Sequence, residues 1–322
     1  MTSDLPKPPC IALLGTSPTL DLDAFIGDQF RALSPGIDLR FPQDLGCLED
    51  IEAALCWFPP HGVLKKLPNL RLIQSLSAGI DHITADADLP RTIPVCRIVD
   101  TTVEEGMASY VTWAVIQHHR GMRVYQANAA EAVWKQQPTV WPRDHRVGIA
   151  GLGVLGLACA RALSSVGYPV SGWNSRPKAD LPPYVRAFHG EEQLGDFLAE
   201  CSSLICLLPL TDQTRGFLGA KVFSQLPRGA HLVNVARGAH LVESDLLAAL
   251  EGGQLSGATL DAFSQEPLPK DHPFWADPRI VVTPHIAAHT DPRIIAQQTL
   301  ENLALILQGQ RPPTCADLGQ GY

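Results

Sequence analysis

Long apolar segments, a secretory signal and paired cysteine motifs are all missing from this chain of 322 residues. No window approaches eighteen uninterrupted apolar residues, which excludes a membrane-spanning helix. The first ten residues contain an acid and three prolines where a signal peptide needs a basic start and an apolar run. None of the eight cysteines forms a CxxC pair, so buried free thiols in a reducing compartment are expected. These absences predict a cytoplasmic protein without a membrane partner.

Positive charge is also scarce. The chain has 25 Lys and Arg against 33 Asp and Glu, so its formal net charge is −8. A phosphate-coated polymer needs a basic surface, so nucleic acid is not an expected partner. Hydrophobic residues make up 45% of the chain and charged residues 18%, a composition typical of globular proteins, and the length favours two domains.

Apolar runs alternate with helical patterns along the whole chain, which predicts a parallel α/β architecture. Strands are expected at 11–15, 53–58, 70–76 and 95–99, and in a second series at 146–151, 168–174, 202–209, 230–236, 256–263 and 279–286. Helices are expected at 22–33, from Glu104 to His119, at 244–253 with Ser244 as N-cap, and at 292–309. Both chain ends lie outside the second series. We therefore expect a domain of residues 104–289 inserted into one formed by 1–103 and 290–322.

The sequence GLGVLG, which begins at Gly151, is a G-x-G-x-x-G motif between an expected strand and an expected helix. Gly151 permits a tight turn, Gly153 lets the backbone approach a pyrophosphate, and Gly156 lets the helix pack close to the strand. The pyrophosphate is expected on the amides of the first helical turn, at Val154 and Leu155. The alternative is a glycine-rich turn without a ligand, which the flanking strand and helix disfavour.

No acidic residue stands about twenty residues after these glycines, where NAD-binding proteins use one to bind the ribose 2′-hydroxyl. The chain instead has Asn174, Ser175, Arg176 and then Lys178. An amide, a hydroxyl and two cations form a suitable pocket for a 2′-phosphate, and arginine can bind it in a bidentate way. The stretch favours NADP(H) over NAD(H). A solvated turn, with NAD(H) as cofactor, is the alternative.

Three polar residues follow strands of the second series: Arg237, Glu266 and His285. In a doubly wound sheet, ligands bind beyond the carboxyl ends of the strands, so the three are expected to meet at the nicotinamide end of the cofactor. Arg237 can bind the carboxylate and carbonyl oxygen of a 2-keto acid. His285 can protonate the developing alkoxide, while Glu266 orients its ring and favours the imidazolium. Singly, each residue could equally serve solubility or cap a neighbour; their joint occurrence favours catalysis.

Four histidines invite a different interpretation as metal ligands. They are His285 and His289, with His240 and His272 elsewhere in the sequence. No acidic ligand is paired with them at the spacing of a metal site. Proton transfer by His285 explains more, and no metal is expected.

With these motifs in this order, the chain resembles the D-isomer-specific 2-hydroxyacid dehydrogenase family. The resemblance rests on GLGVLG, LLPLT (207–211), NVARG (234–238), LDAFSQEPL (260–268) and TPHIAA (283–288), and it covers nearly the whole chain. WNSRPK, NVARGAHLVESDLLAAL and the Gly-Tyr ending are similar to the glyoxylate/hydroxypyruvate reductase branch. The resemblance implies a Rossmann-type doubly wound parallel sheet inserted into a second, flavodoxin-like α/β substrate domain. It also implies a homodimer through the cofactor domain, with the loop at 133–145 as a candidate arm.

The resemblance assigns roles to further residues. Catalysis falls to Arg237, Glu266 and His285, and the cofactor contacts are Leu208, Pro209, Val235, Ala236, Asp261 beside the nicotinamide carboxamide, and Met107 in the linking helix. The segment from Ser77 to Ile83 resembles the substrate loop. There the amides of Ala78 and Gly79 would hold the substrate carboxylate, with Gly79 allowing unusual dihedrals. Trp57 is a candidate wall of the substrate pocket or, equally, a core aromatic.

The implied function is NADPH-dependent reduction of small 2-keto acids, with glyoxylate and hydroxypyruvate as first substrates. One alternative is another dehydrogenase of this fold, of lactate, formate, phosphoglycerate or phosphonate type. The chain ends soon after its last expected helix, which leaves no room for the regulatory domain of longer phosphoglycerate enzymes. The other alternative is a non-catalytic dinucleotide-sensing interaction protein. The intact Arg, Glu and His set argues against it.

Overall fold

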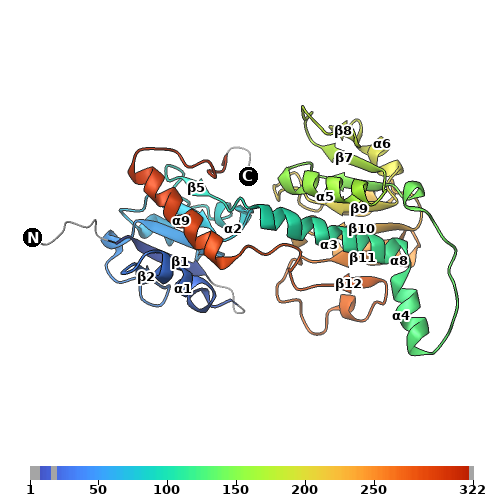
Figure 1. Ribbon diagram of the computed structural model, residues 1–322, viewed down its shortest axis with the longest axis horizontal. Helices are drawn as coiled ribbons and strands as arrows, with labels where there is room; N and C mark the ends of the chain where they lie inside the picture. Colours follow the sequence, from blue (N-terminus) through green and yellow to red (C-terminus); the bar gives the residue numbers. More distant parts are fainter. Residues whose placement is uncertain (1–7, 16–19, 319–322) are drawn as a thin grey trace, which may run out of the picture. The chain divides into compact units, whose positions relative to one another are not determined.

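The computed structural model describes residues 8–15 and 20–318 of the chain. Residues 101–289 form one compact inner unit, and residues 1–100 with 290–322 form an outer unit (Figure 1). The sequence placed the first boundary at 103/104, whereas the helix that opens the inner unit already begins at Thr101. The expectations about the start of the chain and the Gly-Tyr ending fall outside the described residues. The substrate and cofactor roles of the two units stay predictions.

Within its described residues, the outer unit contains a parallel sheet of five strands in the order β2-β1-β3-β4-β5. The strands are β1 (Cys10–Gly15), β2 (Asp38–Arg40), β3 (Ala53–Trp57), β4 (Leu72–Ser75) and β5 (Val95–Cys96). This 2-1-3-4-5 order is the flavodoxin-like one and confirms the expected fold class. The direction of the connections switches between β1 and β3, so Trp57 ends a strand at this switch point.

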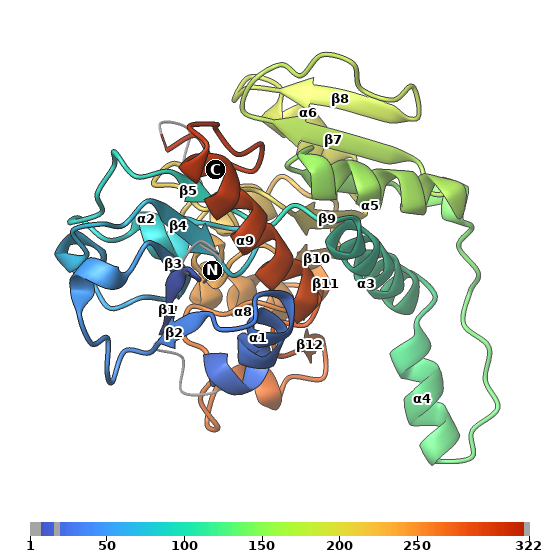
Figure 2. The ribbon, with the colours of Figure 1, turned by 60° about the vertical axis from the view of Figure 1, so that its left-hand side comes forward.

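Helices cover both faces of the outer sheet. They are α1 (Asp28–Leu33) after a π-helical turn (Asp23–Gly27), α2 (Asp81–Thr84), α9 (Pro292–Leu307), and 3₁₀ turns at Leu48–Asp50 and Leu64–Lys66. Because side chains alternate along a strand, Ile11 and Leu13 pack toward α1 and α9, while Ala12 and Leu14 pack toward α2. Figure 2 shows α9 beside α1. Helix α9 thus completes a core that β1 begins.

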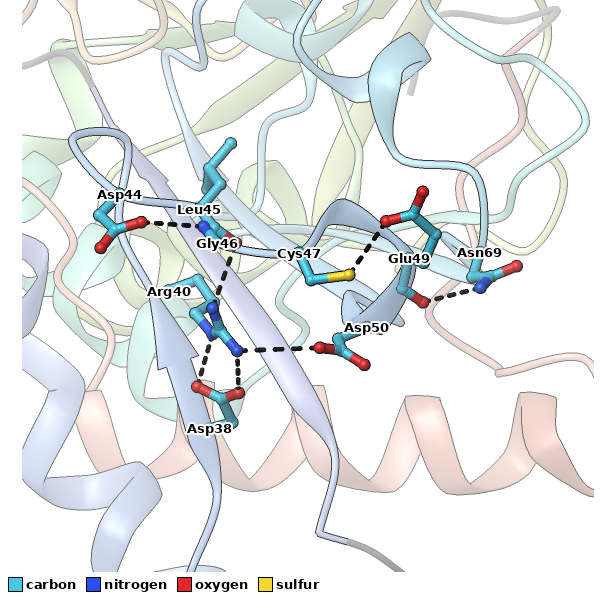
Figure 3. Close-up of polar contacts among 9 residues, drawn as sticks. All are labelled: Asp38, Arg40, Asp44, Leu45, Gly46, Cys47, Glu49, Asp50 and Asn69. Atoms are coloured by element: carbon cyan, nitrogen blue, oxygen red, sulfur yellow. Dashed lines mark hydrogen bonds and ion pairs between the residues drawn. The ribbon is translucent and has the colours of Figure 1, made fainter.

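The edge strand β2 was not predicted from the sequence. It has three residues, and it is held by ionic contacts rather than by an apolar run (Figure 3). Arg40 donates from Nε and Nη2 to the two carboxylate oxygens of Asp38, at 2.7 and 2.6 Å, and from Nη1 to the carbonyl of Leu45 at 3.4 Å. The carboxylate of Asp50 lies 4.0 Å from the same guanidinium. Short, charged edge strands avoid pairing with other chains, and they give little hydrophobic signal.

Within residues 101–289, seven parallel strands run in the order β12-β11-β10-β9-β6-β7-β8. The strands are β6 (Val147–Ala150), β7 (Val170–Asn174), β8 (Val185–His189), β9 (Ser203–Cys206), β10 (Ala230–Asn234), β11 (Leu255–Leu260) and β12 (Ile280–Val282). Numbered within the unit, this is the Rossmann order 3-2-1-4-5-6 with a seventh strand added. The expected doubly wound parallel sheet is confirmed.

Helices also cover both faces of the inner sheet. One face carries α3 (Thr101–His119) and α5 (Val154–Ser165), and the other carries α6 (Leu194–Ala199), α7 (Ala220–Phe223) and α8 (Glu243–Glu251). The remaining helical segments are α4 (Met122–Ala130) and 3₁₀ turns at Pro142–Asp144, Gly238–His240 and Pro273–Trp275. Val147 and Ile149 pack toward α3 and α5, whereas Leu204 and Leu232 pack toward α6 and α8.

Each expected strand has an observed counterpart, most of them shorter than expected, but β2 and β8 were not foreseen. The N-cap role of Ser244 was wrong: α8 begins at Glu243, with Val242 before it, so Ser244 lies inside the first turn. Within residues 8–15 and 20–318, no helix combines the length and the apolar character needed to cross a bilayer.

Candidate active site

The glycine motif forms the turn from β6 into α5. Gly151 has φ +104°, and a Cβ there would stand 2.6 Å from the carbonyl oxygen of Leu207. A Cβ on Gly156 would overlap the carbonyl oxygen of Gly151. A Cβ on Gly153 would meet nothing within 4 Å, so the backbone is open to a ligand at the N-terminus of α5. The residues fit the phosphate group of a dinucleotide, because amides and the helix dipole face this open space.

Asn174 and Lys178 hold the glycine loop itself. The Oδ1 atom of Asn174 accepts a hydrogen bond from the Leu152 amide at 2.8 Å, and Lys178 donates from Nζ to the Leu152 carbonyl at 2.5 Å. Both backbone groups of Leu152, the amide and the carbonyl, are therefore held by side chains from the end of β7 and the turn after it. Ser175 and Arg176 are exposed, and no hydrogen bond of either side chain occurs among the described residues. The sequence did not distinguish Asn174 and Lys178, which hold the loop, from the exposed Ser175 and Arg176. The distinction depends on contacts between residues that are 22 and 26 positions apart.

Glu266 and His285 form an ion pair and hydrogen bond beyond the carboxyl ends of β11 and β12. The Nδ1 atom of His285 lies 2.9 Å from Oε2 and 3.2 Å from Oε1 of Glu266, and the amide of Phe263 donates to Oε1 at 2.9 Å. The two side chains are 32% and 34% exposed. The ring nitrogen that faces the carboxylate is thus Nδ1. His285 has φ +56°, an uncommon conformation for this residue type that recurs at functional sites.

The carboxyl group of Glu266 is ionised in this setting. Burial alone would raise its pKa, but the hydrogen bond and charge of His285, the Phe263 amide and the charge of Arg237 outweigh burial and lower the pKa below its usual value. Arg237 therefore lies close enough to act on the pair. The three residues predicted to be catalytic thus interact through their charges within the inner unit, and their catalytic roles stay predictions.

A set of buried side chains fixes the backbone at Arg237. Asn234 donates from Nδ2 to the Arg237 carbonyl at 3.0 Å, and Arg237 donates from Nη1 to the Ala236 carbonyl at 2.9 Å. The ring of His240 is fully buried: Nδ1 lies 3.3 Å from the Arg237 amide nitrogen and 3.2 Å from the Arg237 carbonyl oxygen, and Nε2 lies 3.3 Å from the Pro209 carbonyl oxygen. His240 is thus a structural residue that joins two predicted cofactor segments.

Asp261 holds the turn that carries His285. Its Oδ1 atom accepts hydrogen bonds from the Thr283 hydroxyl at 2.6 Å and the Ile286 amide at 2.8 Å, and Oδ2 accepts from the Ala287 amide at 2.8 Å. Burial raises the pKa of Tyr110 to about 12, so its phenol stays protonated and donates to Thr283 Oγ1 at 2.5 Å. The resemblance placed Asp261 beside the nicotinamide carboxamide; in the structure it is 1% exposed, with its oxygens committed to this loop.

A pocket of about 590 Å³ lies between α3 and the segment that follows His285. Its lining includes Tyr110, Trp113 and Ile286. Met107, on the buried face of α3, packs into the core and does not line this pocket. The other predicted cofactor residues, Leu208, Pro209, Val235 and Ala236, lie at the carboxyl ends of β9 and β10, the edge that carries the glycine loop.

The predicted substrate loop belongs to the outer unit. The hydroxyls of Ser75 and Ser77 donate to the Gly79 carbonyl at 2.6 and 3.1 Å, and the Ile98 amide donates to the Ser77 carbonyl at 3.0 Å. Ser77, Ala78 and Gly79 are half-buried. Gly79 has no positive φ, so the expectation of unusual dihedrals was wrong, and serine hydroxyls shape the turn instead.

Trp57 is half-buried at the end of β3. Its ring packs edge-on against Phe58, with centroids 5.0 Å apart, and against His82 at 5.2 Å. Both interpretations of Trp57 stay open, because it contacts the core and also ends a strand at the switch point. Among the described residues, no group of three or more His, Cys, Asp or Glu side chains is placed to hold a metal ion.

Comparisons with known proteins give a consistent result. A family model for the D-isomer specific 2-hydroxyacid dehydrogenase NAD binding domain matches residues 112–287. The chain is 39% identical over 285 residues to a glyoxylate/hydroxypyruvate reductase A of Yersinia enterocolitica (86% of this chain, 90% of the relative) and 41% identical over 293 residues to one of Photorhabdus laumondii (89% and 93%).

Solved structures agree with this similarity. A D-isomer specific 2-hydroxyacid dehydrogenase from Xanthobacter autotrophicus Py2, in complex with NADPH and MES, superimposes with a TM-score of 0.88 at 37% identity, covering 98% of this chain and 100% of that one. An NADPH-dependent glyoxylate/hydroxypyruvate reductase from Sinorhizobium meliloti, with NADP and sulfate, also has a TM-score of 0.88, at 30% identity and the same coverage.

Proposed function

Because the chain belongs to the D-isomer-specific 2-hydroxyacid dehydrogenase family, we propose that it reduces small 2-keto acids with NADPH, glyoxylate and hydroxypyruvate first. Family membership makes the chain an NAD(P)-dependent oxidoreductase. The substrates are those named for its relatives. The observation that carries the proposal is the Glu266–His285 pair, 2.9 Å apart, beside Arg237.

The proposed mechanism assigns separate roles to the cofactor, His285 and Arg237. When bound, the reduced nicotinamide supplies the hydride that adds to the carbonyl carbon. His285 donates a proton from Nε2 to the carbonyl oxygen, since Nδ1 is engaged with Glu266. Arg237 binds the substrate carboxylate through its guanidinium. Hydride and proton together convert the 2-keto acid into a 2-hydroxy acid.

We propose that Ser175 and Arg176, rather than the whole WNSRPK turn, determine a preference for NADPH. Both side chains are exposed at the carboxyl end of β7, whereas Asn174 and Lys178 are committed to Leu152. A guanidinium can bind a 2′-phosphate with two hydrogen bonds, and it has no comparable partner on the 2′-hydroxyl of NADH.

The decisive experiment measures kcat/KM for glyoxylate and hydroxypyruvate with NADPH and NADH side by side. We expect efficient turnover and a strong NADPH preference. Arg176→Ala should raise KM for NADPH about tenfold, about 1.4 kcal/mol, and leave KM for NADH nearly unchanged. Arg161→Ala, an exposed charge removed from α5, is the matched control. Equal effects on both cofactors would remove Arg176 from recognition. NADPH binding without turnover of any 2-keto acid would favour a sensor.

We also propose a homodimer that works in the cytoplasm. Large apolar side chains are exposed along α4 and the loop after it, with Trp134 97% and Trp141 56% exposed. Such a patch on a well-packed unit is typical of an interface. All eight cysteines are free thiols, which suits a reducing compartment. Light scattering of the purified protein would give twice the mass of 34.8 kDa, and Trp134→Ser should shift it toward the monomer.

A further inference from the structure

Two cysteines face each other across a short antiparallel pairing in the outer unit. Cys96 ends β5, and Cys315 lies opposite it in the segment after α9. The Arg97 amide donates to the Thr314 carbonyl at 3.1 Å, and the Ala316 amide donates to the Val95 carbonyl at 2.9 Å. These hydrogen bonds flank the two cysteines, so Cys96 and Cys315 form a non-hydrogen-bonded pair. In such a pair the side chains stand on the same face at their closest approach.

The geometry of this pair suits a disulfide. A non-hydrogen-bonded antiparallel pair places its Cα atoms about 4.5 Å apart, inside the range that disulfides require. The two sulfur atoms are already 3.4 Å apart. Side-chain rotation can bring them to the bond length of about 2.05 Å without a shift of the backbone. No other cysteine in the described residues has a sulfur contact of this kind.

The two thiols differ in accessibility, which sets an order of reaction. Cys315 is partly exposed and lines a pocket of about 400 Å³, together with Arg91 and Arg311. Cys96 is fully buried, and burial, with the hydrogen bond from Cys315 second, raises its pKa to about 12. An oxidant therefore reaches Cys315 first, and the two arginines of the pocket, set against one acid, Asp317, favour an oxidant that carries negative charge.

We propose that Cys96 and Cys315 are a redox modification site that closes into a reversible disulfide, with glutathione disulfide as the class of oxidant. The Cys315 thiolate attacks one sulfur of the oxidant, which breaks its S–S bond and releases one glutathione thiolate. The Cys96 sulfur then attacks the mixed disulfide at Cys315 and displaces the second glutathione thiolate. The protons of the two cysteines pass to the two glutathiones, so two cysteines are oxidised and one disulfide is reduced. This proposal does not depend on the proposed function.

Closure would fasten the last segment of the chain to β5, near the predicted substrate loop. Asn302 on α9 donates from Nδ2 to Thr314 Oγ1 at 2.9 Å and to Gln74 Oε1 at 2.8 Å. Ile98, two residues after Cys96, donates its amide to the carbonyl of Ser77. The disulfide would therefore join the segment after β5, which contacts the loop at Ser77, to the segment around Thr314, which Asn302 links to Gln74 at the base of the loop.

The test is peptide mapping of the full-length protein after incubation with glutathione disulfide. Trypsin places Cys96 in residues 92–97 and Cys315 in residues 294–322, because the bond from Arg311 to Pro312 resists cleavage. We expect these two peptides to be cross-linked, with the loss of two hydrogens from the protein mass and full reversal by dithiothreitol. Free, alkylatable thiols at both positions, or glutathione that stays on Cys315, would overturn the proposal.

Three variants sharpen the test. Cys96→Ser should accumulate the mixed disulfide at Cys315, whereas Cys315→Ser should leave Cys96 unmodified because it is buried. Cys47→Ser removes an exposed thiol elsewhere and should leave the cross-link intact. As a second readout, oxidation of the unsubstituted protein should slow hydrogen exchange at the amides of Arg97 and Ala316. Exchange that is unchanged in cross-linked protein would show that the bridge restrains nothing.

Discussion

The two edges of the inner sheet carry histidines in opposite settings. At the carboxyl edge, His285 is 32% exposed and contacts an ionised carboxylate. At the amino edge lies a histidine cluster of four residues, His118, His119, His145 and His231. The rings of His118 and His231 stack with centroids 3.9 Å apart, and those of His119 and His145 at 4.4 Å.

The hydrogen-bond partners of the histidine cluster are neutral hydroxyl groups, and two buried ring nitrogens, Nε2 of His119 and Nδ1 of His231, have no hydrogen-bond partner among the described residues. His145 contacts the Ser203 hydroxyl at 2.8 Å, and His119 contacts the Tyr168 hydroxyl at the same distance. Burial lowers the pKa of His118 and of His145 to about 4, and it lowers the pKa of His231 well below its usual value. The comparison teaches that the setting separates histidines of one sheet: a partly exposed ring beside a carboxylate stays accessible to a ligand, whereas burial among hydroxyls keeps a ring neutral and makes it a packing residue.

The largest effect is expected where the comparison predicts chemistry. His285→Ala should lower kcat by the 10²–10⁴ that a lost general acid costs, while NADPH affinity survives. Steady-state kinetics and cofactor titration by fluorescence measure the two quantities. A near-normal kcat would remove His285 from the mechanism.

Glu266→Gln separates the carboxylate from the ring that it orients. The amide can still contact His285 but carries no charge, so kcat should fall on the order of 10²-fold, less than for loss of the ring. The substitution leaves the buried sets around Arg237 and Asp261 in place, so the thermal midpoint should hardly move. A variant with normal kcat and reduced stability would assign Glu266 to folding alone.

His231→Ala tests the other edge. The ring is 1% exposed, so its removal leaves a cavity and should cost about 2–4 kcal/mol of unfolding free energy, while kcat of the folded protein is unchanged. Urea denaturation gives the first quantity and kinetics the second. His189→Ala, an exposed histidine on β8, should change stability by less than about 0.5 kcal/mol. A loss of kcat without loss of stability would reverse the roles assigned to the two edges.

Acid should destabilise the protein through the histidine cluster. The folded-state pKa of His118 is about 4 against an ordinary 6.5, so below pH 6.5 the unfolded chain binds a proton that the native protein does not. The stability that the neutral His118 ring contributes is fully present above pH 6.5 and is lost as the pH falls toward 4. The loss amounts to roughly 3 kcal/mol of unfolding free energy for His118. The lowered pKa of Glu266 acts in the same direction at lower pH. The urea concentration at the unfolding midpoint should decline from pH 7.5 to pH 6 and pH 5. In His118→Asn this decline should be less steep. Equal declines in the variant and the unsubstituted protein would contradict the assignment.

The sequence was sufficient for most of the fold, because apolar strands and glycine turns are local signals. Both unforeseen strands, β2 and β8, are edge strands, and the half-buried residues of β2 and the exposed residues of β8 break the apolar pattern that marks the central strands. The predicted catalytic residues could be proposed from their positions after strands. Their supports could not, since Asn234, His240 and Asp261 are recognisable only when the folded backbone supplies their partners.

The double attachment of Leu152 has a consequence for how cofactor preference can evolve. An aspartate at position 174 would keep the Oδ1 acceptor that holds the Leu152 amide, and it would also bring the charge that binds a ribose hydroxyl and repels a 2′-phosphate. Lys178 has no such substitute among acidic residues, because its amine donates to the Leu152 carbonyl. A substitution at position 174 would therefore change the cofactor preference and keep the contacts that hold the glycine loop. A substitution at Lys178 would first remove one of these contacts and so loosen the loop that is predicted to bind the phosphates.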